Sequence, residues 1–293
     1  MSISQLKSET KYKKTKIIRG RDYEAKAKYS DLNQRIVVES YSGTGLNNLG
    51  NRLKGEAKSN EYGKIWVKVR FSDHQQFSNI GFIAEGLIED YYLDEAAIIM
   101  AFYPDSERSR QQNREKKDQI VADLLQEESD QGLVELDDDC EFKIAEPSDI
   151  TAMTELYKEV FTSYPTPIFK KEYIEESMNS DVIYGLLYDG EDLVAAASAE
   201  TNPEFKNAEM TDFATLPSAR GNGYASYILN KLESELKARR YHSLYSIARS
   251  TSYGMNKVFK EAEYEYNGRL IQNCHIAGGF EDMNLWCKVL NNN

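Results

Sequence analysis

Polar and apolar residues alternate along residues 64–71, and this two-residue period predicts a half-buried strand. Shorter strand-like runs cover 35–39, 81–88 and 95–103. Residues 42–45 (SGTG) lack the lysine and the helix-opening pattern of a phosphate-binding loop, so we expect a plain turn there. The first part of the chain is therefore expected to be a small α+β domain.

The second part has a more regular pattern. A strand at 141–145 precedes Pro147, which begins a helix with apolar residues at three- and four-residue spacing up to Phe161. Asp189-Gly190 predicts a hairpin between strands at 182–188 and 193–199. Strands at 208–216, 242–247, 269–276 and 283–289 alternate with helices at 223–239 and 253–261. This order predicts an α/β fold of the α+β type, with a mixed, mostly antiparallel sheet flanked by helices.

The two parts are separated by a strongly acidic segment. Eight of the fifteen residues in 127–141 are Asp or Glu, and the preceding residues 105–118 are almost wholly polar. We interpret these stretches as a solvated helix followed by a surface linker. The predicted domains are residues 1–140 and 141–293.

Composition excludes several classes of protein. A length of 293 residues with 41% hydrophobic content fits two domains, and the longest apolar run, 96–103, is too short to span a membrane. The pI near 4.9 argues against a nucleic-acid partner. No apolar segment typical of a secretory signal follows the basic N-terminus. The three cysteines and three histidines have no ligand-like spacing, so we expect reduced thiols, a cytoplasmic protein and no metal site. A homodimer is compatible with this sequence.

Candidate chemistry lies at the start of the helix at 223–239. A strand ends there in a turn that contains Gly221 and Gly223, and Arg220 precedes them. The amides of the first helical turn and the helix dipole form an anion site, and the glycines allow close approach of a pyrophosphate. The patterns GxxxxGK[ST] and GxGxxG are both absent from the sequence, which excludes a P-loop and a Rossmann unit.

The motif Arg220-x-x-Gly223-x-Ala225, between a strand and a helix, resembles the acetyl-CoA-binding motif of the GNAT N-acyltransferase superfamily. The resemblance implies a GNAT-like fold after residue 140 and acetyl-CoA as co-substrate. In that fold the preceding strand splays from its neighbour and pairs with the pantetheine arm. The residues implied to bind pantetheine are Phe213, Ala214 and Thr215, and those implied to bind pyrophosphate are Arg220, Gly221, Asn222, Gly223, Tyr224 and Ala225.

A narrower resemblance covers most of the chain. The segments 209–217 (EMTDFATLP), 247–249 (IAR), 254–256 (GMN) and 283–286 (MNLW), and more weakly 81–86 (GFIAEG), are similar to the β-lysine Nε-acetyltransferase family. Members of that family acetylate the side-chain amine of β-lysine, which yields a neutral compatible solute, in partnership with a lysine 2,3-aminomutase. The alternatives are a GNAT enzyme for another small amine, such as lysine or a polyamine, and a CoA-binding module without turnover.

Acetyl transfer requires a neutral amine, and a carboxylate near the cleft can remove its proton directly or through water. Glu209 lies eleven residues before Arg220, the spacing at which the histone-acetylating GNAT enzymes carry their base. Asp212 is the competing candidate. Strand alternation places Glu209 and Asp212 on opposite faces, so the sequence leaves the choice open.

The resemblance also implies residues on the later elements. Many GNAT enzymes carry a tyrosine that protonates the departing thiolate, but the corresponding position here is Phe259, so Tyr253, Tyr264 or water is expected to replace it. Ser252 and Asn256 are the implied polar contacts of CoA.

The carboxylate of an amino-acid substrate is expected to bind Arg249, because a guanidinium binds carboxylate with two hydrogen bonds. Asn273, His275 and Glu281 are expected to line the same pocket. We expect the first part of the chain to be a degenerate GNAT-like domain that completes this pocket.

Overall fold

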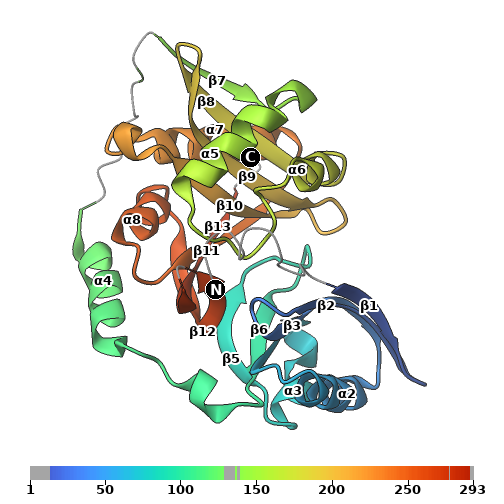
Figure 1. Ribbon diagram of the computed structural model, residues 1–293. Helices are drawn as coiled ribbons and strands as arrows, with labels where there is room; N and C mark the ends of the chain where they lie inside the picture. Colours follow the sequence, from blue (N-terminus) through green and yellow to red (C-terminus); the bar gives the residue numbers. More distant parts are fainter. Residues whose placement is uncertain (1–13, 129–135, 137–138, 277, 291–293) are drawn as a thin grey trace.

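The computed structural model describes residues 14–128, 136, 139–276 and 278–290. Its N-terminal part, blue to green in Figure 1, begins with three consecutive antiparallel strands. The elements of this part are β1 (Lys14–Arg19), β2 (Tyr23–Ser30), β3 (Arg35–Gly43), α2 (Leu46–Ser59), β4 (Lys64–Arg70), η1 (Phe71–Asp73), α3 (His74–Ser78), β5 (Ile83–Ile88), β6 (Ala97–Phe102), η2 (Ser106–Ser109) and α4 (Arg114–Gln126).

The C-terminal part, yellow-green to red in Figure 1, has the predicted elements, most of them with shifted ends, and one additional helix, α6. Its elements are β7 (Cys140–Ile144), η3 (Pro147–Asp149), α5 (Ile150–Val160), α6 (Lys171–Met178), β8 (Val182–Asp189), β9 (Asp192–Asn202), β10 (Asn207–Thr215), η4 (Pro217–Ala219), α7 (Tyr224–Ala238), β11 (Ser243–Arg249), α8 (Tyr253–Glu261), β12 (Glu265–Ile276) and β13 (Gly279–Val289).

All of these strands belong to one sheet, in the order β1-β2-β3-β4-β6-β5-β12-β13-β11-β10-β9-β8-β7. The same arrangement occurs twice within it. In each half, three antiparallel strands lead through a helix to a parallel strand, and a short helix and a hairpin follow. The order β1-β2-β3-β4-β6-β5 therefore has the same topology as β8-β9-β10-β11-β13-β12.

The halves meet where β5 pairs with β12 at Gly86 and Gly268. Gly268 has φ +143°, and a Cβ built on it would lie 2.2 Å from the Glu85 carbonyl oxygen, so this close approach requires glycine. A buried ion pair lies beside the joint: Lys64 Nζ is 2.7 Å from Glu85 Oε2 and donates to the Ile271 carbonyl at 2.8 Å. Strands from both sides of the predicted domain boundary therefore share backbone and side-chain contacts.

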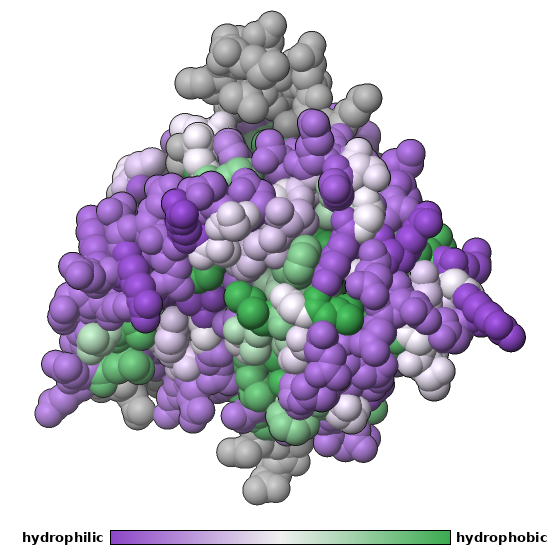
Figure 2. All heavy atoms as spheres, turned by 90° about the horizontal axis from the view of Figure 1, so that it is seen from below, coloured by the Kyte–Doolittle hydropathy of each residue, from purple (hydrophilic) through white to green (hydrophobic). Residues whose placement is uncertain are grey.

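Helices cover both faces of the C-terminal strands (Figure 1). α5 and α6 pack with Tyr184, Leu186 and Ala196 on one face, and α7 packs with Ala195, Ala197 and Ala199 on the other. No helix among the described residues is long and apolar enough to cross a membrane. The face shown in Figure 2 is mostly hydrophilic, with a central strip of apolar residues.

Several predictions for the first part were incomplete. Strands β1 and β2 were not predicted, because the inward positions of β2 are mainly alanines, which are weak strand formers. The turn at 42–45 does lead into a helix, α2, whose buried residues Leu46, Leu49, Leu53 and Ala57 form a stripe. The solvated helix expected near 105–118 begins later, at Arg114. The predicted acidic linker lies mostly at 129–135 and 137–138, outside the described residues.

Candidate active site

A gap between two parallel strands forms the centre of the site. β10 pairs with β11 only from Asn207 to Glu209, and beyond that point the two strands separate. On its other side β10 has a bulge, since the register jumps between Thr211 and Ala214 while β9 advances only from Ser198 to Ala196. Asp212 and Phe213 therefore lie opposite a single residue of β9, and Asp212 has φ +55°.

The bulge interrupts the predicted alternation of β10 side chains between the two faces of the sheet. Glu209 and Thr211 pair with Glu200 and Ser198, whose side chains lie on the α5 face, and Asp212 bonds to that same Ser198. Both candidate carboxylates are thus on one face of the sheet. The prediction of opposite faces was wrong because the bulge inserts one residue between them.

The turn before α7 has the predicted geometry of an anion site. Gly221 and Gly223 have φ +92° and +75°, backbone conformations that residues with a side chain rarely adopt. Gly223 is the N-cap of the 15-residue helix α7 and makes no side-chain capping bond, so the first amides of the helix remain for a ligand. Open space surrounds the Gly221 α-carbon. These features fit the pyrophosphate of CoA.

A cleft of about 750 Å³ runs from this turn into the gap between β10 and β11. Its walls come from β10, the α7 turn, the end of β11 and α8. The predicted residues that line it are Asp212, Phe213, Thr215, Arg220, Gly221, Gly223, Tyr224, Ala225, Arg249 and Ser252. Ala214 packs into the core on the α5 face, and Asn222 lines a neighbouring surface cavity.

A second cavity, of about 310 Å³, adjoins the cleft. We call it the amine cavity. Residues of β3 and β4 line it together with residues of β9 to β13 and of the loop between α5 and α6. The residues that line both the cleft and the amine cavity are Tyr164, Thr211, Asp212, Ile247, Ile276 and Met283.

Asp212 lies at this junction and is only 6% exposed. Burial raises the pKa of its carboxyl to about 6, the Glu200 and Glu209 carboxylates add to the rise, and hydrogen bonds from Tyr164 and Ser198 oppose it. The Ser198 hydroxyl donates to Oδ2 at 2.8 Å. A carboxylate with this pKa is mostly ionised at neutral pH and accepts a proton readily.

Asn256 does not have its predicted role. Its Nδ2 donates to the carbonyls of Arg249 and Ser252, at 2.8 and 2.7 Å, and its Oδ1 accepts from Asn284 and Trp286, both at 2.8 Å. These bonds use both donors and both acceptor sites of the fully buried amide. Asn256 thus fixes the start of α8 and cannot contact CoA.

The two tyrosines predicted to replace the missing proton donor lie away from the gap. Tyr253 is 39% exposed, lies outside the lining of the cleft, and its hydroxyl bonds to Glu127 after α4. Tyr264 is buried behind Phe259, which packs edge-on against Phe213 in the cleft. The structure therefore does not support a catalytic role for Tyr253.

The predicted substrate residues are divided between the two cavities. Arg249 lines the cleft, where its Nη2 lies 3.1 Å from Glu281 Oε1, so its charge is already paired. Asn273 is in the amine cavity. His275 packs edge-on against Phe280 and lines neither cavity. Arg249, Asn273 and Glu281 thus do not form the single predicted pocket.

Sequence reasoning missed several residues of the amine cavity. Tyr164 lies in the loop 163–167, which contains two prolines and directly follows a predicted helix. Loops next to a rigid element often carry functional residues, so this loop could have indicated Tyr164 from the sequence. Nothing local distinguishes the others, because they come from ordinary strand positions of the first part. They are Arg35, Trp66 and Lys68. Ser198 on β9, which bonds to Asp212 from outside the cavity lining, was also missed.

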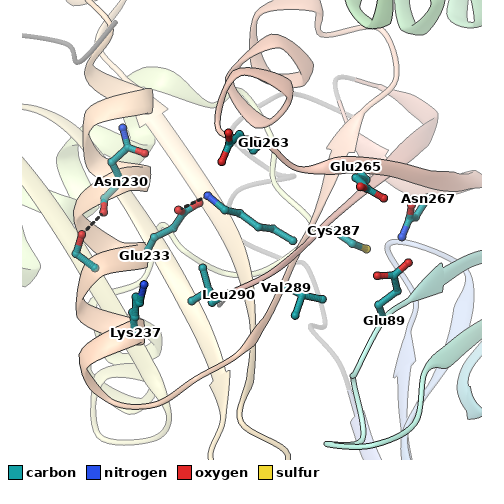
Figure 3. Close-up of a pocket in the computed structure, with 12 residues that line it drawn as sticks. Glu89, Asn230, Glu233, Lys237, Glu263, Glu265, Asn267, Cys287, Val289 and Leu290 are labelled. Carbon is teal, nitrogen blue, oxygen red and sulfur yellow. Dashed lines mark hydrogen bonds and ion pairs between the residues drawn. The ribbon is translucent and has the colours of Figure 1, made fainter. Parts of the chain in front are cut away.

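A further cavity of about 520 Å³ lies between α7, β13 and the start of β12 (Figure 3). Glu89, Glu263 and Glu265 line it, and Glu233 is paired with Lys288 at 2.7 Å. It shares no lining residue with the cleft or the amine cavity and contains no predicted site residue.

The segment that forms most of the cleft matches a known family. The family described as "Acetyltransferase (GNAT) family" matches residues 150–263. Together with the split strands and the anion site, this defines an acetyl-CoA-dependent N-acyltransferase with a GNAT fold.

Relatives extend the match over most of the chain. N-acetyltransferase YodP of Bacillus subtilis is 36% identical over 262 residues, which cover 89% of this chain and 94% of that protein. Two proteins named β-lysine N(6)-acetyltransferase, from Methanosarcina mazei and Methanococcus maripaludis, are each 34% identical and cover 81% and 89% of this chain, and 95% and 94% of their own lengths. The chain belongs to the β-lysine Nε-acetyltransferase family of the GNAT superfamily.

Proposed function

We propose that this enzyme transfers the acetyl group of acetyl-CoA to the side-chain amine of β-lysine. The observation that carries the proposal is the meeting of two cavities at Asp212, one that reaches the glycine turn before α7 and one lined by the carboxylates of Glu200 and Glu209. The names of the relatives from Methanosarcina mazei and Methanococcus maripaludis support β-lysine as the substrate. Acetylation removes one positive charge, so the product is a neutral zwitterion suited to a compatible solute.

Asp212 is the base in this proposal. It lines both cavities, whereas Glu209 lines only the amine cavity. Glu209 is near Lys68 and Tyr245 and is assigned to holding the positive charge of the substrate. Removing the proton from a side-chain amine of pKa about 10.4 at pH 7 requires roughly 4.6 kcal/mol, and a carboxylate of raised pKa is a suitable acceptor.

Bound acetyl-CoA supplies the activated acetyl group. The bulge leaves the amides of Asp212 and Phe213 outside the regular ladder with β9, where they are suited to polarise the thioester oxygen. Tyr164 bonds to Asp212 and lines both cavities, and burial raises its pKa well above the usual range. In the proposal Tyr164 donates its proton to the departing sulfur and recovers one from Asp212, which removes the need for a donor at position 259.

The proposal includes a compartment and a role in the cell. The three cysteines are unpaired thiols, which supports a reducing compartment such as the cytoplasm. We expect the enzyme to form a neutral osmolyte in the cell from β-lysine that an aminomutase supplies.

The test is acetyl-CoA-dependent release of CoA with β-lysine, α-lysine and spermidine in parallel, with a protein-only blank for the thiols. Asp212→Asn and Glu209→Gln are matched, since each removes one charge with little change of shape. We expect selective turnover of β-lysine, a loss of kcat in Asp212→Asn and a higher KM for the amine in Glu209→Gln. Turnover of only the other amines would refute the substrate, and acetyl-CoA binding without any turnover would indicate a binding module.

A further inference from the structure

The charges in the amine cavity are arranged in two groups. Three carboxylates of the cavity come from β9 and β10, those of Glu200, Glu209 and Asp212, and that of Asp212 also lines the cleft. The strands of the N-terminal part contribute the positively charged side chains of Lys28, Arg35 and Lys68 and one carboxylate, that of Glu39. A ligand with amines at one end and an acid group at the other would match this arrangement.

Two of the three cations are already engaged. Lys28 forms an ion pair with Glu39. Lys68 donates to the Tyr245 hydroxyl at 2.9 Å, with its ammonium 5.1 Å from the centres of the Tyr91 and Tyr245 rings. Burial lowers the pKa of Lys68, but Tyr91 and Glu209 outweigh that effect and leave it above the ordinary value.

Arg35 is different, because it has no carboxylate partner within the described parts of the chain and is only 6% exposed. Its Nη1 donates to the Asn273 carbonyl at 2.5 Å and faces the Cys274 sulfur at 3.5 Å. Its Nε is buried without a hydrogen-bond partner. Trp66, which is 5% exposed, also has an unpartnered Nε1, and the Arg35 guanidinium lies 5.8 Å from the centre of its ring.

Two buried donors without acceptors are costly unless a ligand supplies the acceptor. The Asn273 carbonyl orients the guanidinium through Nη1 and leaves the Nε edge for an acid group. A carboxylate is the anion that binds such an edge with two parallel hydrogen bonds.

We propose that Arg35, with the indole N–H of Trp66, binds the carboxylate of the amine substrate. The N-terminal half then sets the specificity for an amino acid over a simple diamine, although it contains none of the residues that bind CoA. The amine end of the substrate is thereby directed toward Glu209 and Asp212. This inference rests on the proposed function, because it assumes that the amine cavity holds the acetyl acceptor.

The experiment compares each amino acid with its decarboxylated counterpart: β-lysine with pentane-1,4-diamine, and α-lysine with pentane-1,5-diamine. The variants are Arg35→Gln, Arg35→Lys and Trp66→Phe. The control is Arg70→Gln, since Arg70 is on β4 but pairs with Glu95 outside both cavities. Thermal unfolding and acetyl-CoA binding check that each variant is folded.

We expect wild type to prefer the amino acids, and Arg35→Gln to lower kcat/KM for them by roughly 10- to 100-fold, mainly through KM, with the diamines little changed. Arg35→Lys and Trp66→Phe should lose selectivity to a smaller extent, and Arg70→Gln should keep it. If Arg35→Gln does not fold, the other two variants decide the question.

Equal losses for amino acids and diamines, or no preference in wild type, would overturn the proposal. Absence of β-lysine turnover in wild type would instead refute the proposed substrate. The α-lysine pair would then still report whether Arg35 recognises a carboxylate.

Discussion

Replacing Asp212 by Asn should abolish most activity and at the same time stabilise the protein. The fold holds the Asp212 carboxyl at a pKa of about 6, against 3.8 without the fold. Keeping this group ionised therefore costs the folded state about 3 kcal/mol above pH 6. Asparagine carries no charge, and it tolerates the left-handed conformation at φ +55°.

The sign of the effect follows from the raised pKa. Between about pH 4 and pH 6 the folded protein binds a proton at Asp212 more tightly than the unfolded chain does, so wild-type stability falls as the pH rises through this range. Asp212→Asn should equal wild type in its free energy of unfolding near pH 4 and exceed it by up to about 3 kcal/mol at pH 7. This gain in the free energy of unfolding is smaller if the Asn side chain forms weaker hydrogen bonds with Ser198 and Tyr164 than the carboxylate does.

The assay is urea unfolding of both proteins from about pH 4 to pH 8, together with initial rates of CoA release. We expect kcat of the variant to fall by about 10²- to 10⁴-fold, and wild-type kcat/KM to fall tenfold per pH unit below about pH 6. A variant that is less stable at every pH, or that keeps its activity, would refute the reasoning. The base would then have to be sought at Glu209.

Three further predictions concern the same architecture. Ser198→Ala removes a bond that stabilises the ionised Asp212, so the acid limb of the pH–rate profile should move to higher pH; a shift to lower pH would contradict this. Gly221→Ala forces φ +92° on an L-residue in open space and should raise the KM for acetyl-CoA roughly tenfold, with a smaller change in the KM for the amine. Lys64→Met leaves the buried Glu85 without its ion-pair partner and should lower the free energy of unfolding by about 3–5 kcal/mol in urea titrations, and an unchanged midpoint would show that the pair is not needed.

Although the two halves share one topology, local contacts explain why the CoA site is proposed only in the second half. In the first half, the turn that corresponds to the CoA turn is occupied by the chain itself. The amides of Thr44 and Gly45 donate to the Asp22 carbonyl at 3.0 and 3.1 Å. The Tyr41 hydroxyl, between β3 and the end of β4, accepts from the Arg70 amide and donates to Asp73. The ligand-binding gap of the second half thus has a filled counterpart in the first.

The local pattern of the sequence determined much of the C-terminal fold. The hairpin between β8 and β9 formed as predicted, with Gly190 and Glu191 as its loop because Asp189 pairs with Asp192, and Gly190 has a positive φ of +58°. The helix at 253–261 has the predicted bounds, and the glycine turn before α7 has the predicted conformation. These features depend on neighbouring residues, whose spacing and backbone preferences are visible in the sequence.

Only the tertiary structure decided how the site is composed. The bulge at Asp212 depends on the register with β9, and one inserted residue moved a carboxylate to the other face. Asn256 was a plausible CoA contact, but two nearby carbonyls and the distant side chains of Asn284 and Trp286 use all of its hydrogen bonds. Arg35 meets Asn273 across 238 positions of the chain, through a sheet that joins two similar halves. Sequence periodicity reports which side of a strand or helix is buried, but the partner that buries it is set by contacts between distant segments.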